Sequence, residues 1–95
     1  MTEVIRYRIH TEHVAPTLVT RAGFAGFSIL QCRGYWQGKA EASHVIEILG
    51  TTEDRPKVTA LAQTIREQYR QAEVWITVEA VSLLRVTIDA VTEGL

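Results

Sequence analysis

The sequence has little of what marks secreted, membrane-spanning or nucleic-acid-binding proteins. Its one cysteine, Cys32, cannot form a disulfide within the chain, and a lone thiol is typical of the reducing cytosol. No apolar run approaches the roughly 20 residues that cross a bilayer, and the opening MTEVIRYRIH alternates where a signal peptide would be continuously apolar. The net charge of −1 gives no general attraction to nucleic acid or to an anionic membrane. We therefore expect a cytoplasmic protein with no nucleic-acid and no membrane partner.

What the chain does contain is enough apolar material for one small core. It has 95 residues, of which 46% are hydrophobic, so we expect a single domain over residues 1–95. A chain this short buries a limited fraction of its surface, and association between subunits would add to that burial.

The first half of the chain alternates between strand and helix patterns. Val4 to His10 has the period of two that indicates a half-buried strand. A short helix should follow over residues 14–22, with Pro16 in its first turn and Gly23 ending it in a left-handed conformation. Phe27–Tyr35 then predicts a core strand, residues 36–43 a polar loop, and His44–Leu49 a second strand paired with the first in a hairpin.

The second half holds the clearest helix and a long apolar alternation. Asp54 to Arg70 predicts a helix that Asp54 caps and that buries a stripe of apolar residues, Val58, Leu61, Ala62, Ile65 and Tyr69. Alternate residues from Val74 to Ile88 are mostly apolar, which is longer than the usual strand of about five or six residues. This last strand either bends near residues 80–83 or extends to pair with another chain.

The resulting order is β-α-β-β-α-β. It predicts an α+β, ferredoxin-like fold, in which an antiparallel sheet carries two helices on one face and ends in an extended last strand. This fold serves many unrelated functions, so it does not by itself indicate one.

Two stretches of the sequence resemble the PII signalling family, which includes nitrogen regulatory PII and CutA-like proteins. Residues 22–39, AGFAGFSILQCRGYWQGK, are similar to the turn, second strand and start of the ligand loop in that family. Residues 73–94, EVWITVEAVSLLRVTIDAVTEG, look like its long last strand, arginine-containing segment and acidic tail. The resemblance implies a homotrimer that binds an adenine nucleotide or another small anion in clefts between subunits. It also implies a protein partner that senses the ligand through the loop joining strands two and three.

The chain departs from the family pattern at the ligand-binding loops. The joining loop is short, and Trp36 stands about where the family has a glycine. Residues 66–75, REQYRQAEVW, contain neither the glycines nor the lysine of the family's second ligand loop, and Arg85 remains from its final basic run. The sequence therefore indicates a divergent PII-like protein with a shortened ligand loop.

The candidate ligand-binding or interface residues lie around this loop and in the last segment. The Trp36 indole could stack on a planar ligand while Arg33 and Lys39 hold an anion and Gln37 orients it. In the alternative, Trp36 packs against a neighbouring subunit, and Lys39 and Glu41 form a solvated pair. The full candidate set is Arg33, Tyr35, Trp36, Gln37, Gly38, Lys39, Glu41 and Arg85.

Other reactive residue types fit structural roles better. His10, His13 and His44 could approach one another at a sheet end and bind zinc with Glu12, but capping or surface positions suit them better, and we predict no metal site. Cys32 should be a small buried residue of the second strand. Glu47 and Glu79 lie in apolar strands and should mark a solvent face or a polar contact between subunits.

Three functions are compatible with these features. The first is a non-enzymatic, trimeric PII-like sensor or adaptor that acts through its subunit clefts and the loop between strands two and three. The second is a structural or interaction oligomer that binds no ligand. The third is a small dimeric ferredoxin-like enzyme of the monooxygenase type, which rests on fold analogy alone. No catalytic residue is assigned.

Overall fold

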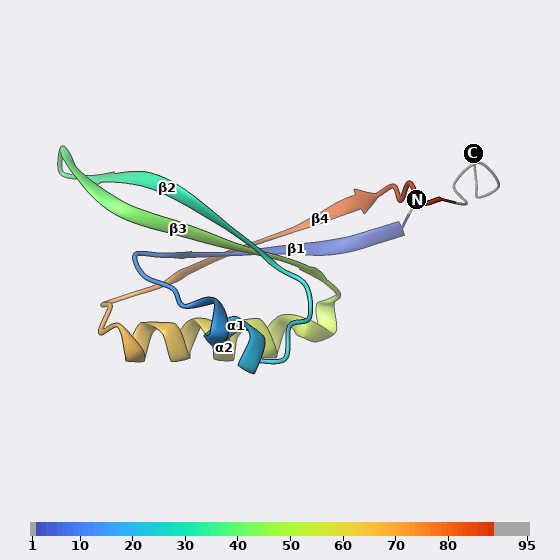
Figure 1. The fold of residues 1–95 in the computed structure, drawn as a ribbon, viewed down its shortest axis with the longest axis horizontal. Helices are drawn as coiled ribbons and strands as arrows, with labels where there is room; N and C mark the ends of the chain where they lie inside the picture. The colour runs from blue at the N-terminus through green and yellow to red at the C-terminus, as the bar shows by residue number, and fades with distance from the viewer. Residues whose placement is uncertain (1, 89–95) are drawn as a thin grey trace.

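The computed structural model of the chain describes residues 2–88 and has a two-layer α+β fold. Its strands are β1 (Thr2–Thr11), β2 (Ser28–Trp36), β3 (Lys39–Gly50) and β4 (Trp75–Leu83). They form one antiparallel sheet in the order β2-β3-β1-β4. The helices α1 (Pro16–Arg21) and α2 (Arg55–Gln68) cover one face of it (Figure 1). The predicted ferredoxin-like fold is therefore confirmed.

The core lies between the sheet and the two helices. Tyr7 and Ile9 of β1 and Ile46 and Ile48 of β3 are almost fully buried there. The helices contribute Val19 from α1 and the predicted stripe of α2, of which Val58, Leu61, Ala62 and Ile65 are buried and Tyr69 packs against the edge. Burying each large apolar side chain contributes about 1.5–3 kcal/mol, so this contact fixes the side of the sheet on which the helices lie.

Both helices begin close to their predicted positions, but Asp54 has a different role. Pro16 is the first residue of α1, and Gly23 follows this helix with a φ of +94°, as expected of a glycine that ends a helix. A short 3-10 helix, η1 (Thr52–Asp54), precedes α2. Asp54 occupies the predicted N-cap position of α2, but its side chain makes no capping hydrogen bond to that helix. Its carboxylate instead accepts a hydrogen bond from the Thr51 backbone N–H at 2.8 Å and completes the capping box of η1, whose N-cap is Thr51.

The prediction of a polar loop over residues 36–43 was wrong. The turn consists of Gln37 and Gly38, whose φ angles of +49° and +79° are those of a tight two-residue hairpin turn. β3 therefore begins at Lys39 and is 12 residues long. Its first residues, KAEAS, lack apolar alternation because no helix covers this end of the hairpin, so their strand character leaves little trace in the sequence.

β4 is nine residues long and ends at Leu83, which lies opposite Thr2, the first residue of β1. The apolar alternation continues beyond it, but Val86 and Ile88 are 83% and 96% exposed and belong to no strand. The acidic tail that contributed to the family resemblance, residues 89–94, lies outside the described residues.

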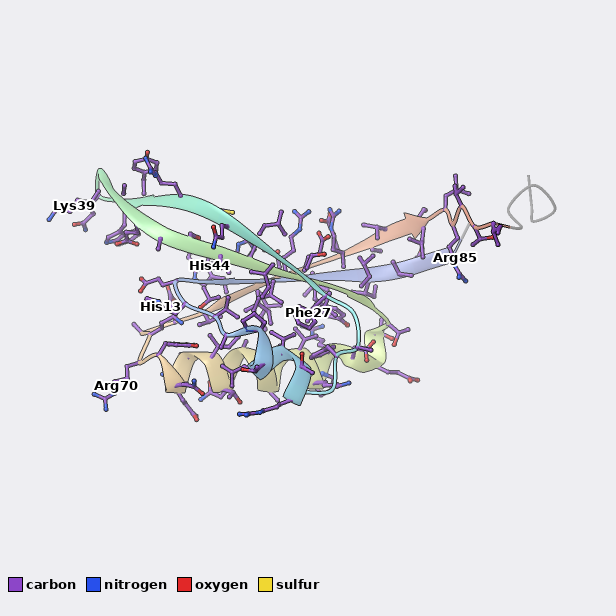
Figure 2. All side chains as sticks on the ribbon, viewed as in Figure 1. His13, Phe27, Lys39, His44, Arg70 and Arg85 are labelled. Atoms are coloured by element: carbon purple, nitrogen blue, oxygen red, sulfur yellow. The ribbon has the colours of Figure 1, made fainter. Side chains whose placement is uncertain are left out.

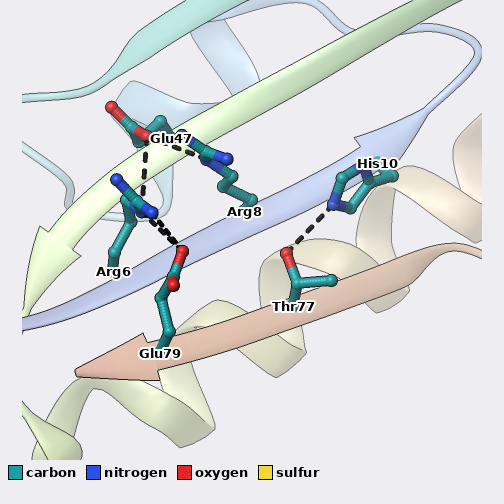
Figure 3. Close-up of polar contacts among 6 residues, drawn as sticks. All are labelled: Arg6, Arg8, His10, Glu47, Thr77 and Glu79. Carbon is teal, nitrogen blue, oxygen red and sulfur yellow. Dashed lines mark hydrogen bonds and ion pairs between the residues drawn. The ribbon is translucent and has the colours of Figure 1, made fainter. Parts of the chain in front are cut away.

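The sheet face opposite the helices, called here the outer face, carries charged side chains. Arg6 and Arg8 of β1 lie between Glu47 of β3 and Glu79 of β4 (Figure 3). Arg8 Nε donates to Glu47 Oε1 at 2.9 Å, and Arg6 Nε donates to Glu79 Oε1 at 3.0 Å. The two glutamates that interrupt the apolar strands thus lie on the uncovered face, each beside an arginine.

β2 is less buried than predicted, because it is the edge strand farthest from the helices. Cys32 is exposed, which contradicts the predicted core position. It pairs with Ser43 in a register that places it on the outer face, whereas Ile29, on the opposite face, packs against the core. Within the described part of the chain, no helix is long and apolar enough to span a bilayer.

Candidate functional site

The β2–β3 hairpin projects past the end of β1 (Figure 1). β1 ends at Thr11, which pairs with His44, whereas β3 continues back from His44 to Lys39 with β2 as its partner. The edge of β3 over residues 39–43 is therefore unpaired on the side where β1 would lie. Alternate backbone N–H and C=O groups along such an edge point away from the sheet and are available to a ligand or another strand.

A cavity of about 400 Å³ lies where β1 ends beside the hairpin, and we call it the hairpin-base cavity. Three segments that are distant in the sequence line it: the end of β1, the hairpin near its turn, and the connection from α2 into β4. Its lining residues are His10, Thr11, Glu12, Gly34, Tyr35, Trp36, Glu41, Ala42, Ser43, Gln71, Ala72, Glu73 and Trp75. The volume lies within the range of about 300–1,000 Å³ that small-molecule sites occupy.

Gln71 fixes one wall of this cavity. Its side chain is buried, accepts from the Glu12 backbone N–H at 3.0 Å and donates to Thr11 Oγ1 at 2.7 Å. The Arg66 guanidinium donates to the Gln71 carbonyl at 3.4 Å. These bonds tie the α2–β4 connection to the end of β1. Sequence reasoning missed Gln71, because a single glutamine after a helix carries no motif.

The end of α2 gives this connection its shape. The Arg70 and Gln71 N–H groups donate to the carbonyls of Glu67 and Arg66, the paired bonds that close a helix C-terminus. Arg70 has a φ of +53°, a conformation that glycine usually adopts at this position. An arginine thus adopts the left-handed conformation that closes this turn, at a position where a glycine is usual.

Three large aromatic side chains line the cavity and remain well exposed. Tyr35, Trp36 and Trp75 are 66%, 64% and 63% exposed. Trp75, at the start of β4, was missed because the apolar alternation of the last strand consists of the even-numbered residues, and Trp75 lies between two of them. A tryptophan at an outward-facing strand position is the signal that could have identified it.

The structure brings only some of the predicted site residues together. Tyr35, Trp36 and Glu41 line the hairpin-base cavity. Gln37 and Gly38 form the turn, and Lys39 follows at its tip without lining the cavity. Arg33 does not line this cavity but borders a neighbouring hollow of the hairpin, which Cys32, Glu41 and Ala42 also line.

Arg85 lies far from the others. It follows β4 at the opposite end of the molecule from Lys39 (Figure 2). The longest dimension of the molecule is 50 Å, so within one chain Arg85 cannot share a ligand with the hairpin.

The three histidines each have a different contact. His10 Nε2 lies 3.0 Å from Thr77 Oγ1 (Figure 3), and His44 Nδ1 lies 3.0 Å from the Glu12 carbonyl oxygen. The His13 ring packs on Tyr69 with 5.4 Å between centroids. Over residues 2–88, no group of three or more histidine, cysteine, aspartate or glutamate side chains is arranged to hold a metal ion.

Sequence comparison and structure comparison give different results. Neither a protein-family profile nor a curated protein matches the sequence. Among solved structures, a phage SAM lyase in complex with S-methyl-5′-thioadenosine matches with a TM-score of 0.66 and 21% identity over 80% of both chains. CPII, a nitrogen regulatory PII-like protein from Thiomonas intermedia bound to ADP, AMP and bicarbonate, matches with a TM-score of 0.60 and 16% identity. That alignment covers 90% of this chain and 98% of CPII.

A third similar structure is CutA from Synechococcus elongatus complexed with Bis-Tris, with a TM-score of 0.56 and 19% identity over 86% of this chain and 87% of CutA. Identities this low carry the fold and not the function. The element order, the sheet topology and these three matches agree with the resemblance found in residues 22–39 and 73–94. The chain has the fold that PII-like proteins and CutA share.

Proposed function

We propose that this protein is a non-enzymatic small-ligand sensor or adaptor, and that the hairpin-base cavity is its ligand site. The observation that carries the proposal is a concave site lined by three exposed aromatic side chains and by polar side chains from three separate segments. Large exposed aromatic side chains around one hollow are uncommon on a surface that binds nothing.

The ligand that we propose contains an adenosine group. ADP and AMP in CPII and S-methyl-5′-thioadenosine in the phage SAM lyase share this group. A purine ring is flat and could stack on Trp36 or Trp75, and a cavity of about 400 Å³ is large enough for a nucleoside. The sequence pointed to an adenine nucleotide or another small anion, and these remain among the ligands to be compared.

We propose further that the working form is a homotrimer in which a neighbouring subunit helps to close the cavity. Arg85 and the hairpin lie at opposite ends of one chain, so they could meet at one ligand only if they come from different subunits. The uncovered outer face offers a surface on which subunits could associate.

The hairpin is the element through which a partner protein would sense the ligand. It projects beyond the layer of helices (Figure 1), and its β3 edge over residues 39–43 has no second partner strand within the described chain. A ligand held between this hairpin and the α2–β4 connection would restrict the hairpin's orientation. A protein partner would then bind the free hairpin and the restricted hairpin with different affinities.

Calorimetric titration with adenosine, S-methyl-5′-thioadenosine, AMP, ADP and citrate tests the ligand proposal. We expect heat and a change in tryptophan fluorescence with at least one adenosine compound. Trp75→Ala should weaken that binding by about tenfold, since loss of one stacking contact costs roughly 1–2 kcal/mol. Trp75→Phe should retain most of it. If none of these compounds gives a heat of binding or changes the tryptophan fluorescence, the proposal is contradicted.

A structural oligomer without ligand is the second candidate, and the exposure of Tyr35 and Trp36 favours it as well. In that case the two rings are covered by a neighbouring subunit and not by a small molecule. Trp36→Ala would then lower the mass measured by light scattering. An unchanged oligomer with lost ligand binding would favour the sensor.

A further inference from the structure

We propose that the hairpin-base cavity selects an organic cation attached to a planar group, such as a sulfonium or an alkylated ammonium, over a phosphorylated ligand. This proposal rests on the proposed function and specifies the chemical class of its ligand.

The charged groups of the cavity are carboxylates. Glu12 follows β1, Glu41 lies in β3 and Glu73 lies between α2 and β4, so three separate segments each bring one glutamate to the same hollow. Among the described residues that line it, none is lysine or arginine. The whole chain has a net charge of −1, so this concentration of negative charge is local. A phosphate placed here would be repelled, whereas a cation would be attracted.

The nearby arginines do not line the cavity, and the Arg70 side chain points away from the sheet at the end of α2 (Figure 2). Arg66 donates to the Gln71 carbonyl, which turns its guanidinium toward the helix end. Arg6 and Arg8 pair with Glu47 and Glu79 on the outer face. Over residues 2–88 these are the ion pairs that the structure contains, so none of them neutralises a glutamate of the cavity. Arg33 and Lys39 lie on the hairpin but outside the lining.

The aromatic side chains fit the same class of ligand. Tyr35, Trp36 and Trp75 line the cavity. The face of an aromatic ring has a negative electrostatic potential that attracts cations. Alkylated cations lose less hydration on entering such a site than a primary ammonium does, and aromatic cages recognise them for that reason. The chain contains one example of this contact, since Lys57 Nζ lies 4.5 Å from the centre of the Phe24 ring. Rings and carboxylates together thus favour a cation on a flat ligand.

Two matched pairs of compounds test this proposal on the unaltered protein. S-adenosylmethionine and S-adenosylhomocysteine differ by one methyl group and one positive charge, while AMP and adenosine differ by the phosphate. We expect calorimetry to show S-adenosylmethionine binding on the order of tenfold more tightly than S-adenosylhomocysteine. AMP should bind no more tightly than adenosine. Added salt should weaken the binding of the cation most.

Variants then test whether the glutamates of the cavity cause the preference for a cation. Glu41→Gln and Glu73→Gln should each lower the ratio between S-adenosylmethionine and S-adenosylhomocysteine about threefold or more. Glu53→Gln removes the same charge from η1, outside the cavity, and should leave the ratio unchanged. Thermal unfolding of each variant checks that it is folded, and the comparison on the unaltered protein stands without them.

The two proposals fail in different ways. Tighter binding of AMP and ADP than of adenosine, with no preference for S-adenosylmethionine, would overturn the cation proposal and leave the adenosine sensor standing. A cation preference that Glu41→Gln and Glu73→Gln both leave intact would also overturn it. If no adenosine compound binds, both proposals are wrong.

Discussion

At the residue scale, the outer face contains two arginines that form ion pairs with two glutamates. The hydrogen bond that Arg6 donates to Glu79, together with the arginine's positive charge, lowers the pKa of the Glu79 carboxyl below its ordinary value. The same contact raises the pKa of Arg6. The unpaired carboxylate in the unfolded chain keeps the ordinary value, so the pair links folding to pH.

We predict that this pair stabilises the fold above about pH 4.5, the ordinary pKa of glutamate, and that the stabilisation disappears as the pH falls through the lowered pKa of Glu79. Glu79→Gln should therefore unfold at a lower urea concentration than the unaltered protein at pH 7, and the difference should shrink toward pH 3. Glu3→Gln, an exposed position on the same sheet, is the control. A difference of equal size at both pH values would contradict this origin.

Site residues were predictable where they carried both an unusual side chain and a position in a recognisable pattern. Trp36 lies between Gly34 and Gly38 in a segment similar to a known loop, so the sequence identified it. Trp75 is equally exposed but lay within an apolar alternation, and Gln71 acts through buried hydrogen bonds that only the packed structure reveals. Arg85 was grouped with the hairpin by resemblance, whereas the fold places it at the other end of the chain.

At the element scale, the sequence predicts elements well where one face is buried. The α2 stripe and the alternation of β1 follow directly from packing against the core. The start of β3 does not, because residues 39–43 extend beyond the helices and need no apolar face. The turn at Gln37 and Gly38 also lacks the Asn-Gly or Asp-Gly pair that usually identifies such turns.

The α2 terminus offers a test of how the site is shaped. Arg70 adopts a left-handed conformation that costs a residue with a side chain about 1 kcal/mol relative to glycine. We predict that Arg70→Gly raises the free energy of unfolding by about 0.5–1 kcal/mol in urea titrations. Ala60→Gly, on the exposed face within α2, should lower it by about 1 kcal/mol. A loss of stability in Arg70→Gly would show that the arginine side chain itself holds the turn.

At the scale of the whole molecule, one chain leaves two features incomplete. The hairpin-base cavity is open to solvent, and the outer face is uncovered over all four strands. Association of identical chains would explain both features, and it is the arrangement in which Arg85 of one subunit could meet the hairpin of another. A dimer would instead favour the monooxygenase-like enzyme as the closer analogy.

Native mass spectrometry of the protein with S-methyl-5′-thioadenosine tests trimer formation and ligand binding together, because one spectrum reports both the number of subunits and the number of bound ligands. We predict a trimer that carries up to three ligand molecules, and a Trp75→Ala variant that remains a trimer but binds the ligand about tenfold more weakly. A trimer or a monomer to which no ligand binds would contradict it.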